Sequence, residues 1–156
     1  MRKLTRWQTT WIAGFLEGEG SFVISYQAKK LSDGRSNFRM RISTGQKDPI
    51  PLNYILKTTG IGYLNYKEKS REIGSFSYHH QINKRQDIID FIKAIYPYIK
   101  SPRTRKRAWC VYRMANLINC NGSNERITDD NHKSRIKIYE IWKTTRRPRR
   151  TKSKVK

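Results

Sequence analysis

Hydrophobic residues recur at helical spacing over residues 8–17 and then change to strict alternation with polar residues. Spacings of three and four residues are typical of an amphipathic helix, whereas alternation is typical of a half-buried strand. The alternation runs over residues 21–29 and again over residues 37–44, with Asp33 and Gly34 between them as favourable turn residues. The pattern therefore predicts a helix followed by a β-hairpin.

The same order of patterns follows a second time in the middle of the chain. A helix is expected between Asp48 and Gly60, because aspartate is a good N-cap, proline suits the first helical turn and glycine favours the helix end. Further patterned segments are strands over residues 61–70 and 74–83 and helices over about residues 86–96, 101–118 and 132–142. This order predicts an α+β fold, in which two hairpins form a four-stranded antiparallel sheet backed by helices.

The length of 156 residues suits one globular domain. Residues 1–145 contain all of the patterned segments and are predicted to form that domain. Residues 146–156 are rich in Lys and Arg and have no hydrophobic pattern, so we expect a basic tail that is disordered until it meets phosphate groups.

The charge of the chain is strongly unbalanced, with 34 Lys and Arg against 12 Asp and Glu and a formal net charge of +22. Such an excess indicates a polyanionic partner, and nucleic acid is the first candidate. A membrane partner is not expected, because no apolar segment reaches the roughly 18 residues that a spanning helix needs. The N-terminus lacks the apolar region of a secretory signal peptide, so secretion is not expected, while an organelle (chloroplast or mitochondrion) and the bacterial cytoplasm both stay open.

The polar side of the predicted sheet combines Lys and Arg with Ser, Gln and Asn. Cationic side chains neutralise phosphates, and Arg, Gln and Asn form paired hydrogen bonds with base edges, so this side is predicted to bind double-stranded DNA rather than only water. The expected DNA-binding residues are Ser25, Gln27, Lys29, Arg35, Arg39, Arg41, Ser43, Asn65, Lys67, Lys69 and Tyr78. Polar groups on both sides of the strand at residues 75–82 leave open whether Tyr78 and His80 or Ser77 and His79 face the DNA.

Two glutamates with glycine neighbours, Glu17 and Glu19, lie where the first predicted helix gives way to a strand. A carboxylate at such a turn is a hard oxygen ligand of the kind that Mg²⁺ prefers, and the accessible carbonyl of Gly18 could be another. One carboxylate makes a poor site, but a second copy of the chain would supply its equivalent. The small residues Ala13 and Gly14 would let two such helices approach closely, and glycine after each acid allows unusual backbone angles.

Residues 12–20, with the sequence IAGFLEGEG, resemble the LAGLIDADG motif that names a class of homing endonucleases. The segments STGQKD, GIGYL and SPRTRKRAW also resemble parts of that family in the same order, so the resemblance covers about residues 8–145. It implies an αββαββα fold with C-terminal helices and a site-specific DNA endonuclease encoded by an intron. Family members of this kind make a Mg²⁺-dependent double-strand break with short 3′ overhangs at a long pseudo-palindromic target.

The resemblance also implies roles for individual residues. Glu19 corresponds to the family's metal-binding acid, with the Gly18 carbonyl as a second ligand for Mg²⁺, and Mn²⁺ or Ca²⁺ could substitute in binding. Gln46 corresponds to the glutamine that positions water. The family's basic active-site residue corresponds to Lys106, with Arg105 as the second choice.

A single copy of the motif implies a homodimer, and the expected interface is Thr10, Ala13, Gly14 and Glu17, with Glu17 touching the end of the partner helix. Two alternatives stay open. An intron maturase of the same family would bind RNA, with or without cleavage. A non-catalytic basic nucleic-acid-binding protein would explain the charge, but it would not explain the glycine-flanked acids.

Overall fold

The computed structural model describes residues 1–27, 37–68, 76–118 and 128–145, and its helices and strands follow in the predicted order. They are α1 (Arg6–Glu19), β1 (Gly20–Gln27), β2 (Asn37–Gln46), α2 (Ile50–Thr59), β3 (Tyr63–Glu68), β4 (Phe76–Ile82), α3 (Arg85–Ile95), the short 3₁₀ helix η1 (Tyr96–Tyr98), α4 (Pro102–Leu117) and α5 (Asp129–Thr144). The predicted tail and three expected DNA-binding residues, Lys29, Arg35 and Lys69, lie outside the described residues. None of the helices in the described part is long and apolar enough to cross a membrane.

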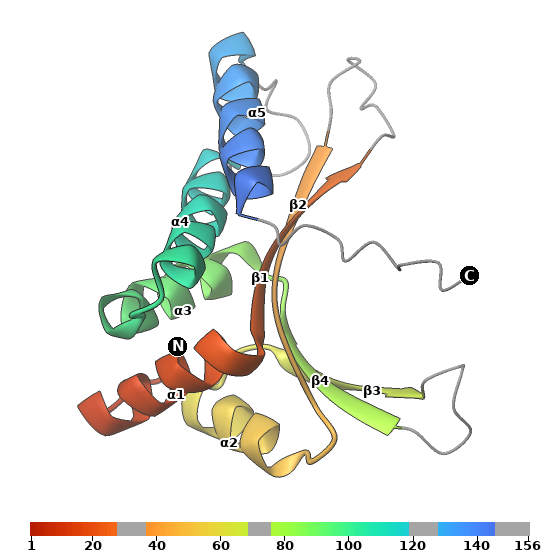
Figure 1. The fold of residues 1–156 in the computed structure, drawn as a ribbon, viewed down its shortest axis with the longest axis vertical. Helices are drawn as coiled ribbons and strands as arrows, with labels where there is room; N and C mark the ends of the chain where they lie inside the picture. The colour runs from red at the N-terminus through yellow and green to blue at the C-terminus, as the bar shows by residue number, and fades with distance from the viewer. Residues whose placement is uncertain (28–36, 69–75, 119–127, 146–156) are drawn as a thin grey trace, which may run out of the picture.

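The strands form one four-stranded antiparallel sheet in the order β1-β2-β4-β3, and the helices lie on one side of it (Figure 1). The sheet is curved, and no helix of the described residues covers its other side. The predicted α+β fold with a helix-backed antiparallel sheet is therefore confirmed.

The register of the strands separates a hydrophobic side of the sheet from a polar side. Phe22 pairs with Ile42, and Ile42 pairs with Ile82, so these buried side chains form a row toward the helices. Ile12 and Leu16 of α1 belong to the same core. Burying one such side chain contributes roughly 1.5–3 kcal/mol, which explains why the register is well determined. The intervening strand residues consequently project from the uncovered side.

α1 is longer at both ends than its hydrophobic spacing predicted. It begins at Arg6 because Thr5 and Gln8 form a capping box, in which each side chain accepts a hydrogen bond from the other residue's backbone N–H. It ends at Glu19, so both acids lie on the helix and the strand begins immediately after them.

Gly20 is required by a close approach of the chain rather than by an unusual backbone angle. A Cβ at this position would lie 2.5 Å from the carbonyl oxygen of Leu16, although the φ of −87° suits any residue. The expectation of unusual angles at Gly18 and Gly20 is therefore wrong, because positive φ among the described residues occurs at Gly60 and Gly62. The glycine allows β1 to leave α1 directly.

Candidate active site and DNA interface

Glu17 is held within its own chain. Its Oε1 accepts hydrogen bonds from the backbone N–H groups of Lys100, at 2.6 Å, and Ser101. These two residues lead into α4, whose N-cap is Ser101. Glu17 therefore ties the end of α1 to the beginning of α4 through one carboxylate oxygen, and its expected contact with a partner helix stays a prediction.

Glu19 is in the opposite situation. Its side chain is exposed, and no described residue forms a hydrogen bond or ion pair with its carboxylate. Because Gly20 pairs with Thr44, Glu19 lies beside the end of β2, where Gln46 is the last residue. The antiparallel register thus places the predicted metal ligand and the predicted water-positioning residue toward the same end of the β1–β2 pair.

The end of α1 suits a cation for an electrostatic reason. A helix C-terminus carries a partial negative charge, and α1 has no basic residue in its last turn to balance it. Glu19 adds a full negative charge there, and Gly18 is exposed, with open space where a side chain would be. The oxygens present are of the type that Mg²⁺ binds. The described residues contain no group of three or more His, Cys, Asp or Glu that could hold a metal ion.

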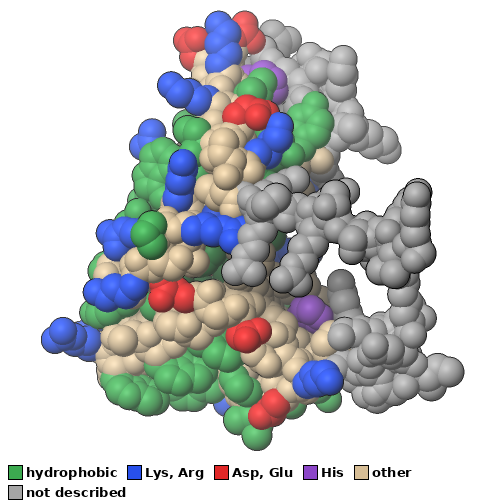
Figure 2. All heavy atoms as spheres, in the orientation of Figure 1, with side chains coloured by type: hydrophobic (Ala, Val, Ile, Leu, Met, Phe, Trp, Pro, Cys, Tyr) green, Lys and Arg blue, Asp and Glu red, His purple; other side chains and the backbone are tan. Residues whose placement is uncertain are grey.

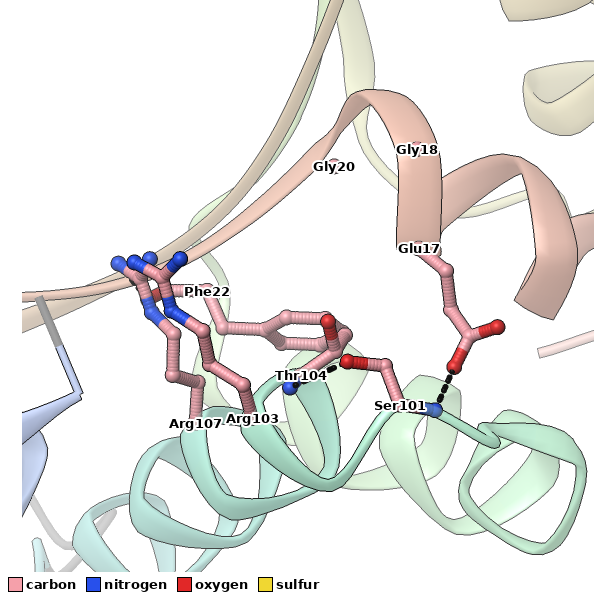
Figure 3. Close-up of a pocket in the computed structure, with 8 residues that line it drawn as sticks. All are labelled: Glu17, Gly18, Gly20, Phe22, Ser101, Arg103, Thr104 and Arg107. Atoms are coloured by element: carbon pink, nitrogen blue, oxygen red, sulfur yellow. Dashed lines mark hydrogen bonds between the residues drawn. The ribbon is translucent and has the colours of Figure 1, made fainter. Parts of the chain in front are cut away.

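A hollow of about 520 Å³ lies between the end of α1 and the first turns of α4, and we call it the α1–α4 hollow. Its walls are Glu17, Gly18, Gly20, Phe22, Ser101, Arg103, Thr104 and Arg107. The side chains of Arg103 and Arg107 extend from α4 toward Phe22 of β1 (Figure 3). Two guanidinium groups therefore lie in the same hollow as the C-terminal end of α1. Guanidinium groups form charge-assisted hydrogen bonds with phosphates, so the hollow suits a phosphate group.

Lys106 and Arg105, the basic residues expected at the site, do not line the α1–α4 hollow. The Arg105 guanidinium lies 4.5 Å from the centre of the Tyr96 ring and donates to the carbonyl oxygen of Ile99. Lys106 is exposed, and its charge acts on Cys110, where it opposes the rise in thiol pKa that burial causes. Residues four positions apart lie on the same face of a helix, so Arg103 and Arg107 share one face of α4. The packing of α4 turns this face, rather than positions 105 and 106, toward the hollow beside β1.

α5 packs against the α1–α4 hollow through Trp142. Its Nε1 donates to the carbonyl oxygen of Phe22 at 2.9 Å, and the Arg107 side chain donates to the same oxygen at 3.2 Å. The Arg107 guanidinium also lies 5.3 Å from the centre of the Trp142 ring.

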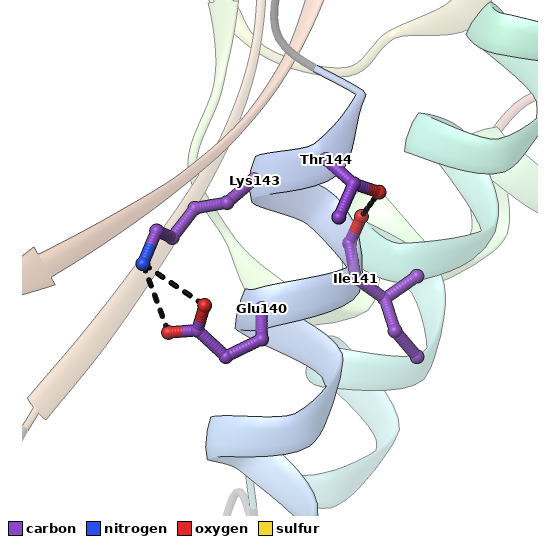
Figure 4. Close-up of polar contacts among 4 residues, drawn as sticks. All are labelled: Glu140, Ile141, Lys143 and Thr144. Carbon is purple, nitrogen blue, oxygen red and sulfur yellow. Dashed lines mark hydrogen bonds and ion pairs between the residues drawn. The ribbon is translucent and has the colours of Figure 1, made fainter.

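The ion pair between Glu140 and Lys143 of α5 is exposed (Figure 4), so it contributes only about 0–1 kcal/mol to stability. Both partners of that ion pair belong to α5, so the contact between α5 and β1 comes from the buried tryptophan.

The side chains on the exposed side of α1 become smaller toward the C-terminal end of the helix. Thr10, Gly14 and Gly18 are exposed at intervals of four residues, and a Cβ on either glycine would meet open space. Trp7, at the N-terminal end of this side, is 65% exposed. Ala13 is fully buried in the core of its own chain, so its predicted place at a dimer interface is wrong.

The polar side of the sheet contains most of the expected DNA-binding residues that the structure describes. Ser25 pairs with Arg39, and Ser21 pairs with Ser43, so these residues project from the same side as Arg41. Both arginines are exposed. Asn65 projects from the same side, and Gln27 and Lys67 occupy positions of the same register on β1 and β3.

Tyr78 is on the other side of the sheet. It pairs with Gln46 and with Tyr66, and it shares this side with the buried His80. Ser77 and His79 are the residues of β4 that face the polar side, which answers the question that the sequence left open. Tyr78 is therefore removed from the candidate DNA-binding residues.

His80 is fixed on the helix side by its surroundings. Its Nε2 lies 2.8 Å from the carbonyl oxygen of Ile61, and a Cβ on Gly62 would lie 2.6 Å from that nitrogen. Burial lowers the pKa of the imidazole below its ordinary value of 6.5, and the hydrogen bond to Ile61 opposes part of this shift. His80 therefore packs on the helix side together with the buried Ile82, which leaves Ser77 and His79 on the polar side.

Tyr63 and Gln81 also lie on the polar side and were not among the expected DNA-binding residues, whereas His79 belonged to one of the two alternatives left open. His79 lies over Gly45, where a Cβ would be 2.9 Å from the imidazole ring, and its Nε2 is 2.9 Å from the Ser77 hydroxyl. The pairing of β4 with β2 and β3 places these residues next to the predicted ones. That pairing joins segments distant in sequence, so alternation within one strand could not reveal it.

Comparison with known proteins agrees with this arrangement. A family model described as LAGLIDADG endonuclease matches residues 12–112, which is more than half of the chain. The match runs from the middle of α1 to α4 and so includes Glu19, Gln46 and both arginines of the α1–α4 hollow. No curated protein sequence matches the chain.

Solved structures share the fold. An archaeal intron-encoded homing endonuclease, I-Vdi141I, complexed with DNA, has a TM-score of 0.71 and 23% identity, covering 91% of this chain and 86% of its own. A group I intron-encoded homing endonuclease, I-CeuI, complexed with DNA, has a TM-score of 0.68 and 23% identity, with 98% and 72% coverage. The homing endonuclease I-CvuI, in complex with its target in the presence of Ca, has a TM-score of 0.63 and 14% identity, with 93% and 86% coverage.

Proposed function

The chain belongs to the LAGLIDADG endonuclease family, and from that premise we propose that two copies of it cut one long, pseudo-palindromic DNA target with Mg²⁺. Membership makes the protein a site-specific, metal-dependent DNA endonuclease. The choice of Mg²⁺, the homodimer, the short 3′ overhangs and the roles of individual residues are the proposed parts. The contrast between Glu17, whose carboxylate is held inside its chain, and Glu19, which is exposed immediately before β1, carries the proposal.

Glu19 and the Gly18 carbonyl would hold Mg²⁺, with a second Glu19 from the other copy. Bound there, the metal would supply Lewis-acid stabilisation of charge on the phosphate and lower the pKa of a water molecule. Mn²⁺ and Ca²⁺ accept the same oxygen ligands, so they are expected to support DNA binding. Gln46 would orient water by hydrogen bonding, and Arg103 and Arg107 would neutralise the phosphate in the α1–α4 hollow.

The shape of α1 supports a homodimer with a close contact at one end. Gly14 and Gly18 allow two α1 helices to approach near their C-termini, whereas Trp7 requires more room between their N-termini. Two helices that cross in this way bring their Glu19 residues together. A two-fold axis through that crossing would also make the two polar sheet surfaces equivalent, and equivalent surfaces read a pseudo-palindromic sequence.

A cleavage selection tests the proposal. A plasmid library with long randomised inserts is incubated with the wild-type chain in Mg²⁺, and linearised plasmids are recovered and sequenced. Wild type is expected to enrich a related set of pseudo-palindromic inserts and to leave short 3′ overhangs. Glu19→Gln should bind the recovered DNA in Ca²⁺ with nearly unchanged affinity and cut it at least about a hundredfold more slowly in Mg²⁺.

Two outcomes would contradict parts of this proposal. Full cutting by Glu19→Gln would refute the metal-ligand assignment. If wild type linearised no plasmid but bound structured RNA tightly, the maturase alternative would replace DNA cutting as the function of this chain. Gln8→Ala, which changes α1 far from its acidic end, is the matched control and should cut normally.

A further inference from the structure

Three side chains on the polar side of the sheet form a hydrogen-bonded chain that we call the Tyr63 network. The Asn83 amide Nδ2 donates to the Tyr63 hydroxyl at 2.7 Å, and this hydroxyl donates to Gln81 Oε1 at 3.3 Å. Tyr63 lies on the edge strand β3, Gln81 lies on β4, and Asn83 follows β4 directly. The network therefore crosses two strands and reaches the beginning of the connection to α3.

The position of the network is central to the proposed DNA surface. Tyr63 pairs with Gln81, Gln81 pairs with Ser43, and Ser43 pairs with Ser21, so these side chains form one row across the whole sheet. Asn83 lines a second hollow, of about 540 Å³, that we call the β2 hollow. The β2 hollow is also lined by Ser25, Arg39 and Arg41 from the candidate DNA-binding residues. The network thus links the middle of the sheet to the arginines of β2.

The chemistry of the hydroxyl imposes opposite roles on the two amides. An amide side chain can present either its NH₂ or its carbonyl oxygen, because a half-turn exchanges them. A phenol has a single proton to donate. If that proton goes to Gln81 Oε1, then Asn83 must be the donor to Tyr63, as the structure shows. Gln81 keeps its NH₂ for an outside partner, and Asn83 keeps its carbonyl oxygen.

We propose that Tyr63 is a positioning residue for base selection, which fixes Gln81 as a hydrogen-bond donor and Asn83 as an acceptor toward DNA. Gln81 then favours bases with acceptors in the major groove, such as guanine O6 or thymine O4, and Asn83 favours the amino groups of cytosine or adenine. Since one hydroxyl orients both amides, the two base preferences are linked. This inference rests on the proposed function, because it needs DNA on the polar side of the sheet.

The burial of the three residues fits this role. Gln81 is only 6% exposed, so neighbouring groups restrict its amide, whereas Tyr63 is 42% exposed and Asn83 is exposed. Tyr66, on the same strand, is 54% exposed and projects from the opposite side of the sheet, next to Tyr78. Tyr66→Phe therefore removes the same hydroxyl from the same strand without touching the network, which makes it a matched control.

The test is a binding selection from a randomised double-stranded DNA library in Ca²⁺, followed by sequencing of the bound fraction. Wild type is expected to select linked preferences at two positions in each half-site. Tyr63→Phe should bind the best site within about threefold of wild type, yet lose roughly tenfold of the discrimination at those two positions, together with their linkage. Tyr66→Phe should give the wild-type profile.

A second variant gives an outcome that loss of folding cannot imitate. In Asn83→Asp the carboxylate only accepts, so it takes the Tyr63 proton, and Gln81 must donate to the hydroxyl and present its carbonyl oxygen outward. The preference opposite Gln81 should then invert from guanine or thymine to cytosine or adenine. Unchanged base preferences in both Tyr63→Phe and Asn83→Asp would overturn this inference but leave the proposed function standing. The same holds if Tyr66→Phe loses as much base discrimination as Tyr63→Phe. Failure of wild type to select any DNA would instead overturn the proposed function, and this inference with it.

Discussion

At the scale of single residues, two glutamates two positions apart differ in what surrounds their carboxylates. Glu17 accepts from two backbone N–H groups before α4, while Glu19 projects into solvent at the negative end of a helix. The sequence predicted different roles for the two acids, and the role of Glu19 as a metal ligand stays a prediction. It could not predict the partner of Glu17, because that contact joins residues 83 and 84 positions apart in the chain.

The basic residues of α4 give a prediction at the same scale. Arg103→Ala should lower the single-turnover cutting rate at least tenfold, because it removes positive charge from the α1–α4 hollow, whereas Lys106→Ala should change this rate less than about threefold. Single-turnover cutting of a selected target measures both effects, with Ca²⁺ binding as the control for affinity. A larger loss in Lys106→Ala than in Arg103→Ala would return the role to the residue that the sequence favoured.

The sequence could narrow the basic residue to one segment but could not choose within it. The choice depends on the rotation of α4, which is set by buried residues such as Ala108, Val111 and Met114. Ala13 illustrates the same limit, since a small residue suits both a helix crossing and a tightly packed core. Because Ala13 is fully buried within one chain, it belongs to the core and not to a helix crossing between two chains.

At the scale of secondary-structure elements, α1 combines a buried side, a small exposed side and an acidic end. Capping by Thr5 and Gln8 explains where the helix begins, and the close approach at Gly20 explains where it ends. The hydrophobic spacing predicted the helix itself, but both ends depend on particular side chains rather than on periodicity. The face with Gly14 and Gly18 is the part of α1 that its own chain leaves uncovered.

Gly14→Leu tests that face. The Cβ of the added side chain meets open space within the chain, so the fold should keep its stability, and replacing a helical glycine contributes up to about 1 kcal/mol in favour of the helix. The dimer should dissociate at least tenfold more readily, and cutting should fall with it. Sedimentation equilibrium measures the dissociation constant, and thermal unfolding checks the fold. A dimer of wild-type stability would exclude this face as the interface.

The strand β4 gives a prediction about pH. Burial lowers the pKa of His80 in the folded state, so the unfolded state binds more protons as the pH falls below about 6.5. The stability that comes from the neutral imidazole is therefore fully present above pH 6.5 and is lost as the pH falls toward the folded pKa. Urea unfolding at several pH values should show a steeper loss of the free energy of unfolding for wild type than for His80→Gln. Parallel curves would contradict this origin of the acid sensitivity.

At the scale of the whole molecule, the net charge of +22 exceeds what the polar side of the sheet alone explains. Lys and Arg side chains also occupy the helical surface in the view of Figure 2, where they outnumber the acidic ones. Composition predicted an anionic partner, and the topology indicates which surface is shaped for it. The fold class and element order followed from the sequence, because each segment had its own period, whereas the strand order required long-range pairing.

This charge predicts a strong dependence of DNA binding on salt. Neutralising phosphates releases counterions, so the association constant should fall about 10³- to 10⁵-fold between 50 and 200 mM salt if roughly 6–10 phosphates are contacted. Fluorescence anisotropy over a salt series gives the slope of the logarithm of the association constant against the logarithm of the salt concentration. Arg39→Ala should reduce this slope by no more than the contribution of about one phosphate contact. An affinity independent of salt would mean that base contacts alone hold the complex.

The carbonyl oxygen of Phe22 accepts hydrogen bonds from Arg107 and from Trp142, a residue 120 positions away in the chain. During translation, β1 and α4 therefore leave the ribosome well before the tryptophan that packs against Arg107. The wall of the α1–α4 hollow formed by Phe22 and Arg107 therefore depends on a helix at the far end of the described chain. The last helix thus completes the surroundings of Phe22 and Arg107, and a chain shortened before residue 142 would lack both contacts that the tryptophan makes.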